Sequence, residues 1–138
     1  DSDMKFPKDL LHALLESGKR IVGANCTTRV EPIVTNTSDL HGAKLESRGN
    51  RGDEQVRSTG LAVMLIDCDV FKKLQPPIFM MEWIQSENAY CGEDVYFCMK
   101  AEEVGEDIWI NHGISQEIEH IGNKTYGHKD IIREEDDA

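Results

Sequence analysis

The sequence predicts a domain of the α/β class, and three observations favour this class. Two apolar runs, at residues 21–24 and 58–66, have the length and composition of buried strands. Two amphipathic segments, at residues 7–17 and 93–104, have the apolar spacing of helices. The two kinds of segment alternate along the chain, which is typical of α/β domains. We therefore expect one α/β domain over residues 1–130, a length sufficient for a single core.

The first helix is expected to follow Pro7, because proline suits the first helical turn. Leucines between residues 10 and 15 form one apolar stripe, and Gly18 stands where a C-terminal cap is needed. The apolar run at residues 21–24 then predicts a short buried strand.

Between residues 26 and 57 the periodic pattern is lost. This segment is rich in Thr, Asn, Ser and Gly, and its most polar part is residues 48–54. A loop of this length inside a compact domain is uncommon and is usually functional or disordered. We therefore expect a long flexible loop at about residues 26–57.

The apolar run at residues 58–66 predicts a buried strand. Asp67 or Asp69 can cap the short helix that follows, and the prolines at residues 76–77 end it. Residues 79–83 predict a short strand or an irregular core segment.

The last third of the chain begins with the amphipathic helix predicted at residues 93–104, which has Gly105 beyond its end. Residues 107–110 predict a further strand. The remainder to residue 129 is expected to be mostly loop or short helix, and residues 131–138 form a solvated acidic tail.

The charge balance excludes some classes of partner. The chain carries 26 acidic and 15 basic residues, which gives a net charge of −11. Such a surface repels a phosphate backbone, so nucleic acid is not an expected partner. A small phosphorylated ligand stays compatible with it, because a bound metal inverts the local field. No apolar run approaches the roughly 18 residues of a membrane span, and four cysteines without CxxC spacing indicate reduced thiols and a cytoplasmic location.

Two carboxylates stand one residue apart in Asp1-Ser2-Asp3. At a strand end or a turn they can converge, so that one binds a hard divalent cation while the other takes a ribose hydroxyl or a metal-bound water. The alternative is that both acids favour the positive end of the helix that follows Pro7.

A second acidic motif, Gly92-Glu93-Asp94, stands at the start of the helix predicted at residues 93–104. The helix dipole there favours an ionised carboxylate, which is able to accept a proton. Glycine also lets a substrate approach the backbone closely. Simple capping of the helix is the alternative role of the two acids.

His120 lies in a polar stretch, and a neutral imidazole is a common ligand of transition metals. A surface histidine without a function is the alternative, and His112 and His128 compete with it as candidate ligands. Thr59-Gly60 precedes an apolar run, where glycine either admits a sugar against the backbone or begins the strand.

Taken in order, these motifs resemble the C-terminal half of a GT-A-fold glycosyltransferase, a Rossmann-like fold that acts on nucleotide-diphospho-sugars. Asp1-Ser2-Asp3-Met4 is similar to the DxD motif that ends a core strand in such enzymes. Residues 58–74 resemble the glycine-led strand and short helix under the sugar site. Gly92-Glu93-Asp94-Val95-Tyr96-Phe97 resembles the ED motif, and Glu119-His120-Ile121-Gly122 resembles the late histidine that completes metal coordination.

The resemblance implies a metal-dependent enzyme that moves a sugar from a nucleotide-diphosphate donor to an acceptor hydroxyl of a glycan or another molecule. Asp1, Asp3 and His120 would hold the divalent cation, Mn²⁺ with Mg²⁺ as the alternative, and Asp1 would also contact the donor ribose or a metal-bound water. The cation would offset the charge that builds up on the leaving diphosphate.

The resemblance also implies roles for the other motifs. Asp94 would be the general base, acting with inversion at the anomeric carbon, and Glu93 would hold the acceptor or the donor sugar. Thr59, Gly60 and Gly92 would line the substrate site. The loop at residues 26–57 would order over the donor and exclude water.

In this fold the half before the DxD motif forms most of the nucleotide pocket, and we expect it upstream of Asp1. Activity is therefore expected from a longer protein and hardly from this chain alone, whose exposed sheet edge favours self-association. Two other functions compete with transfer. One is a non-catalytic carbohydrate- or metal-binding module of the same fold, and the other is a DxD-type phosphohydrolase whose first aspartate is the nucleophile.

Overall fold

A computed structural model of the chain describes residues 2–132 and contains both helices and strands, as the sequence predicts. The buried strand predicted at residues 58–66 is wrong in extent, because only Met64–Ile66 form a strand, and these three residues are half-buried. The central sheet has the strand order β3–β7–β2–β4. Its members are β2 (Ile21–Gly23), β3 (Asp53–Val56), β4 (Met64–Ile66) and β7 (Ile108–Asn111). The two inner strands, β2 and β7, run parallel, and each outer strand is antiparallel to its neighbour. The domain is therefore of mixed α/β type.

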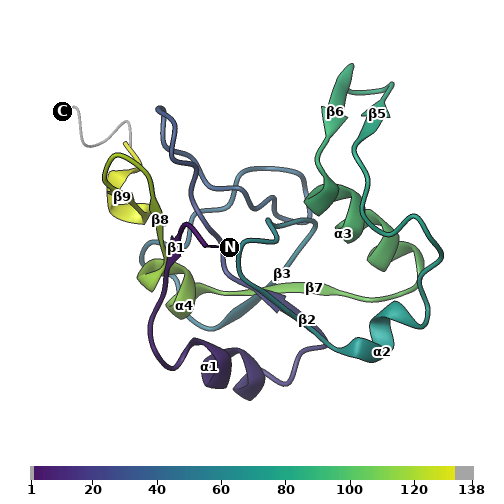
Figure 1. Ribbon diagram of the computed structural model, residues 1–138, viewed down its shortest axis with the longest axis horizontal. Coiled ribbons are helices and arrows are strands. Elements are labelled where there is room, and N and C mark those ends of the chain that lie inside the picture. Colours follow the sequence, from purple (N-terminus) through teal and green to yellow (C-terminus); the bar gives the residue numbers. More distant parts are fainter. Residues whose placement is uncertain (1, 133–138) are drawn as a thin grey trace.

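Helices cover both faces of the central sheet (Figure 1). On one face lie α2 (Cys68–Phe71) and α3 (Glu93–Glu103), and on the other lie α1 (Leu10–Glu16) and α4 (His112–Glu117). As predicted, the Asp67 side chain caps α2, since it accepts a hydrogen bond from the Asp69 backbone N–H at 2.8 Å. Each face of the central sheet is thus covered by two helices.

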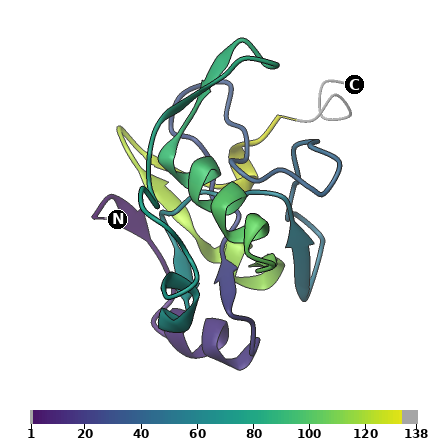
Figure 2. The same ribbon diagram turned by 90° about the vertical axis from the view of Figure 1, so that its right-hand side faces the viewer.

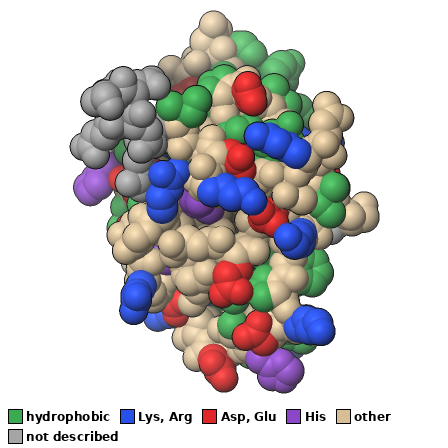
Figure 3. All heavy atoms as spheres, turned by 90° about the vertical axis from the view of Figure 1, so that its left-hand side faces the viewer, with side chains coloured by type: hydrophobic (Ala, Val, Ile, Leu, Met, Phe, Trp, Pro, Cys, Tyr) green, Lys and Arg blue, Asp and Glu red, His purple; other side chains and the backbone are tan. Residues whose placement is uncertain are grey.

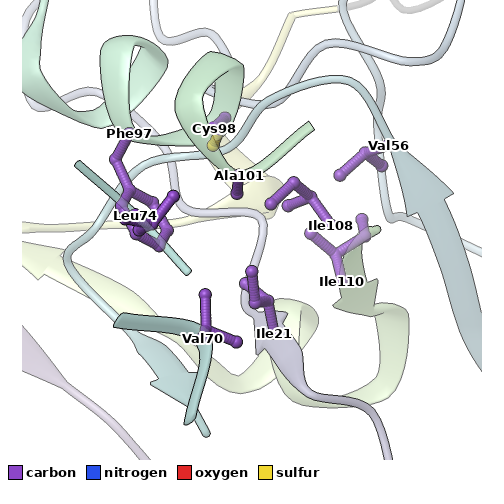
Figure 4. Packing of buried hydrophobic residues seen from close by; sticks show 9 residues of the cluster. All are labelled: Ile21, Val56, Val70, Leu74, Phe97, Cys98, Ala101, Ile108 and Ile110. Carbon is purple, nitrogen blue, oxygen red and sulfur yellow. The ribbon is translucent and has the colours of Figure 1, made fainter. Parts of the chain in front are cut away.

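Successive side chains along the inner strands point to opposite faces of the sheet, and each face has its own apolar cluster. Ile21 packs against α2 and α3, whereas its neighbour Val22 packs against α1 and α4. In Figure 4 the α3 side chains Phe97, Cys98 and Ala101 point toward the sheet. This packing fixes the position of α3, whose first turn carries the acidic motif.

A second, smaller sheet joins the beginning of the chain to its end. It consists of β1 (Met4–Lys5), β8 (Glu119–Ile121) and β9 (Thr125–Tyr126), with β8 in the middle and both pairings antiparallel. A 3₁₀ helix, η1 (His128–Asp130), follows β9. The sequence predicts loop or short helix here, and this prediction is wrong for β8 and β9, whose two or three residues are too few to show a period.

At residues 79–83 the predicted short strand is confirmed for Glu82 and Trp83, and the alternative of a core segment is wrong. These residues lead into a hairpin of β5 (Glu82–Ile84) and β6 (Ala89–Cys91) that stands away from the body of the domain (Figure 2). Met81 is 64% exposed and Trp83 is 43% exposed. The core prediction fails at this point because apolar composition alone does not distinguish a buried segment from an exposed apolar arm.

The prediction of a long loop is confirmed for residues 26–52 and wrong for residues 53–56, which form the edge strand β3. Isolated bridges such as Thr27 to Thr35 hold the loop to itself, and side chains including Thr37 and Ser47 are fully buried. A movement of the whole loop would therefore have to break interior contacts.

The leucines of α1 do not form one buried stripe, since Leu14 is buried while Leu11 and Leu15 are more than half exposed. Residues 133–138, which hold most of the predicted acidic tail, lie outside the described residues. Within residues 2–132 no helix is long and apolar enough to cross a membrane.

Candidate metal and substrate site

Asp3 and His120, which are 117 residues apart in the sequence, meet at the pairing of β1 with β8. Met4 lies opposite His120 in this pairing, and the Asp3 carbonyl accepts a hydrogen bond from the Ile121 backbone N–H at 2.7 Å. The register brings the Asp3 carboxylate to the imidazole, with 3.2 Å between Oδ2 and Nε2. The two side chains that the sequence selects as metal ligands are therefore neighbours.

The other ring nitrogen of His120 fixes the orientation of the imidazole. Nδ1 lies 2.9 Å from the Thr27 carbonyl oxygen, and because a carbonyl can only accept, Nδ1 carries a proton. In the neutral imidazole the Nε2 lone pair then faces the Asp3 carboxylate, so two acceptors face each other. A metal cation between them would satisfy both groups. Metal-binding histidines commonly donate their second ring N–H to a carbonyl in this way.

A third group, Arg29, contacts the same carboxylate. Its Nη1 donates to Asp3 Oδ2 at 2.8 Å and lies 3.4 Å from the Ile121 carbonyl oxygen. The contact with His120 is the largest cause that lowers the pKa of Asp3 below its usual value, and the charge of Arg29 acts in the same direction. The Asp3 carboxylate is thus kept ionised at neutral pH, which is the form that binds a cation.

The charges around this pair differ from those of the chain as a whole. Glu119, next to His120, forms ion pairs with both Lys5 and Lys129, which lower the pKa of its carboxyl. With Arg29 beside Asp3, cations prevail in this group of residues, although the chain has a net charge of −11. Figure 3, which shows the side of the molecule that carries the small sheet, has basic side chains interspersed among the acidic ones. The cluster therefore suits an anionic ligand.

Two ligands do not complete a metal site. Asp1, the third predicted ligand and a predicted ribose contact, lies outside the described residues. Within residues 2–132 no group of three or more His, Cys, Asp or Glu side chains is arranged to hold a metal ion. Further ligands would therefore have to come from Asp1, from water or from the phosphate groups of a substrate.

The acidic motif at residues 92–94 stands at the N-terminus of α3, as predicted. Gly92 is the N-cap residue, with φ −75° and ψ 169°, and Glu93 and Asp94 occupy the first turn. The Oδ1 atom of Asp94 accepts a hydrogen bond from the Val95 backbone N–H at 2.8 Å, and Oδ2 has no partner among the described residues. One carboxylate oxygen of Asp94 is thus available to accept a proton.

Thr59 and Gly60 are interior residues and do not line an open pocket. Thr59 is 1% exposed, and its hydroxyl shares a 2.7 Å hydrogen bond with the hydroxyl of Thr37. Asn36 lies over Gly60, so closely that a Cβ atom added to Gly60 would stand 2.2 Å from Asn36 Nδ2. A side chain at position 60 would therefore displace Asn36, and the sugar pocket expected at this pair is covered by Asn36 in the structure.

We expect Gly60→Ala to destabilise the domain by about 1–3 kcal/mol, the usual penalty of an overpacked site. The same substitution in an Asn36→Ala background should cost much less, because the overlapping side chain is then gone. Urea unfolding of the two single variants and the double variant measures the coupling between the two positions. An equal penalty in both backgrounds would mean that Asn36 is not the cause.

His120 contacts Asp3, whereas His112 and His128 have other hydrogen-bond partners among the described residues. Both ring nitrogens of His112 are occupied, since Nδ1 lies 2.9 Å from Ser47 Oγ and Nε2 lies 2.7 Å from Glu54 Oε2. His128 is buried and lies 2.8 Å from the Asn25 carbonyl oxygen through Nε2, and burial lowers its pKa. These histidines stabilise the loop and the chain end from inside.

Two of the four cysteines, Cys26 and Cys98, are poorly suited to act as nucleophiles. All four are free thiols, as the sequence predicts. Burial raises the pKa of Cys26 to about 12 and that of Cys98 to about 11, so both stay protonated at neutral pH.

Sequence reasoning missed Arg29 and the Thr27 carbonyl. Neither carries a local signal, because Arg29 lies in a polar loop where charged residues are common, and a backbone carbonyl is invisible in the sequence. Only the long-range pairing of β1 with β8, which brings His120 beside the loop, identifies them.

Comparison with known proteins gives a likeness of fold. No protein-family model matches the sequence, and no curated protein matches it. Among solved structures, the crystal structure of A197 from STIV is similar to this chain with a TM-score of 0.53 and 16% sequence identity. The likeness covers 88% of this chain and 55% of that one, so this chain matches about half the length of A197.

Proposed function

We propose that the chain is part of a metal-dependent glycosyltransferase that moves a sugar from a nucleotide-diphosphate donor to an acceptor hydroxyl. The observation that carries the proposal is the contact of Asp3 with His120, in which a carboxylate oxygen and an imidazole nitrogen lie 3.2 Å apart. The order of the acidic and histidine motifs along the chain supports the same conclusion. The parts of the reaction are assigned to residues as follows.

Asp3 and His120 would hold the divalent cation, Mn²⁺ or Mg²⁺, and oxygen atoms of the donor diphosphate would supply further ligands. The donor set fits such an ion, because it combines a carboxylate with an imidazole whose second nitrogen is bonded to Thr27. The bound ion supplies charge neutralisation for the leaving diphosphate. Arg29, Lys5 and Lys129 add positive charge around it.

Asp94 is the general base that takes the proton from the acceptor hydroxyl, and Glu93 holds the acceptor or the donor sugar. The helix that carries this motif is connected to the metal ligands only indirectly, through the loop and Thr59. The Thr27 segment that holds His120 is bridged to Thr35, and the adjoining Asn36 lies over Gly60. The carbonyl of Thr59, beside Gly60, accepts the thiol hydrogen bond of Cys98 in α3. The loop that orients His120 thus reaches α3, while Asp94 itself contacts neither Asp3 nor His120 among the described residues.

The hairpin of β5 and β6 supports an acceptor site next to Asp94. It leads directly into Gly92, and it carries Trp83 and Tyr90 in an edge-to-face pair whose ring centroids are 4.9 Å apart. Both rings are substantially exposed, at 43% and 68%. Exposed aromatic rings with a polar edge suit the mixed apolar and hydroxyl surface of a sugar.

The proposal is tested first by Mn²⁺ binding to the 138-residue chain, measured by calorimetry or by the electron paramagnetic resonance of free Mn²⁺. We expect Asp3→Asn and His120→Ala each to weaken binding about ten-fold or more, because even the loss of a group behind a metal ligand has effects of this size. His12→Ala, which removes an exposed histidine on α1, is the matched control and should bind normally.

Metal affinity that is unchanged in both ligand variants would reject the metal site.

A second measurement separates an enzyme from a binding module. In it the full-length protein is given UDP-, GDP-, CDP- and dTDP-sugars with Mn²⁺. Metal-dependent transfer from one donor supports the transferase, whereas metal and sugar binding without transfer or donor hydrolysis supports the non-catalytic module.

A further inference from the structure

The cation in contact with the candidate metal ligands is Arg29, and neither the motifs nor the comparisons assign it a role. Its Nη1 donates to Asp3 Oδ2, the same oxygen atom that faces His120 Nε2. Arg29 follows directly on the Thr27 segment whose carbonyl orients His120, and its side chain is 51% exposed. One guanidinium nitrogen thus stands where a metal ion would approach the carboxylate.

The guanidinium and a divalent cation cannot both keep this position. A guanidinium and a metal ion that share one carboxylate oxygen repel each other. At such a short separation this repulsion persists even in water. Binding of the metal would therefore weaken the contact of Nη1 with Asp3. The side chain is long and half exposed, so it can turn away without a movement of the backbone.

The guanidinium has donors left for another ligand. Nη1 serves Asp3 and the Ile121 carbonyl, while Nη2 and Nε have no partner among residues 2–132. The planar fork of a guanidinium fits two oxygen atoms of a phosphate at once. The excess of positive charge from Lys5 and Lys129 beside Glu119 favours an anion at the same place.

We propose that Arg29 is the resident counter-cation of this site, which neutralises Asp3 while the metal is absent and turns to the donor diphosphate once the metal is bound. This inference rests on the proposed function, because it takes Asp3 and His120 as metal ligands. It adds the residue that binds the leaving group and the reason why the acidic site is stable when empty. A structural link between the loop and β1 is the competing role of Arg29, and it predicts different measurements.

The test uses the 138-residue chain and two probes, Mn²⁺ alone and inorganic pyrophosphate in the presence of saturating Mn²⁺. Pyrophosphate carries the diphosphate chemistry without a base or a sugar, so it does not need the nucleotide pocket. We expect Arg29→Ala to bind Mn²⁺ about two- to five-fold more tightly, on the scale of a released exposed ion pair. The same variant should bind pyrophosphate about ten-fold more weakly, on the scale of a lost charge-assisted hydrogen bond.

Two further variants serve as controls. Arg29→Lys keeps the charge and should retain the native Mn²⁺ affinity, while losing part of the pyrophosphate affinity because it lacks the fork. Arg51→Ala removes the same charge from an exposed position at which the structure shows no side-chain partner among residues 2–132, and it should change neither affinity. Thermal unfolding of each variant checks that the fold is retained.

The opposite directions of the two effects distinguish the proposal from a structural role. If Arg29 has only a structural role, Arg29→Ala should lower the affinities for Mn²⁺ and pyrophosphate together or change neither. Either result would overturn the inference. If the native chain binds no Mn²⁺ at all, the proposed function fails and not only the role of Arg29. If the native chain binds Mn²⁺ through Asp3 but Arg29→Ala leaves both affinities unchanged, the function stands and this inference falls.

Discussion

Asp94→Asn is expected to reduce sugar transfer by about 10²-fold or more, the scale on which the loss of a general base acts. Asparagine has nearly the same shape, so it can still accept the hydrogen bond that Val95 donates to Oδ1. It cannot take up a proton at the second oxygen, which has no partner among the described residues. The measurement is the transfer rate of the full-length protein with saturating donor and acceptor.

Binding of Mn²⁺ and of the donor should be unchanged in this variant, because Asp94 lies in α3 and does not contact Asp3 or His120. Glu93→Gln is the matched control in the same helical turn, and it should affect substrate affinity more than the rate. Near-normal turnover in Asp94→Asn would move the role of the base to Glu93 or to another residue. A loss of folding can be recognised because the melting temperature would fall.

The sequence predicts α3 and the inner strands of the sheet correctly, because each of these elements has a recognisable apolar pattern within its own residues. In α3 the apolar side chains recur at helical spacing, and in β2 and β7 the apolar runs are unbroken. The helix start at Gly92 is predicted for the same reason, because the motif and the first turn are adjacent in sequence. Local patterns are therefore sufficient for the elements that carry Asp94.

The meeting of Asp3 with His120 depends on a different kind of information. Each residue can be selected by its chemistry, and the resemblance pairs them, but β1 and β8 are too short to be recognised as partners. Arg29 and the Asn36 side chain over Gly60 could not be predicted at all, because they reach the site from a loop without periodicity. These contacts depend on which distant segments pair and in which register, and no pattern in the sequence indicates that pairing.

Phe97→Ala is expected to destabilise the domain by about 3–5 kcal/mol, the usual effect of removing a buried aromatic ring. Phe97 is fully buried in α3 and is packed between Phe71 and Phe79, with the Phe79 ring stacked at 5.2 Å and 18°. The loss of unfolding free energy has two parts. One is the favourable transfer of the ring out of water, and the other is the cost of the cavity that the ring leaves. Thermal unfolding should show a melting temperature lowered by about 10–20 °C.

This substitution also tests how α3 holds the proposed base, because Phe97 lies one helical turn after Asp94. Below the melting temperature, a looser helix should lower the transfer rate while leaving Mn²⁺ affinity at Asp3 and His120 unchanged. Phe79→Ala is the matched control, since its ring is 47% exposed and its loss should cost about 1 kcal/mol. If both variants were equally destabilised, the aromatic cluster rather than the buried position of Phe97 would be holding the helix, and the hairpin base would be part of the core.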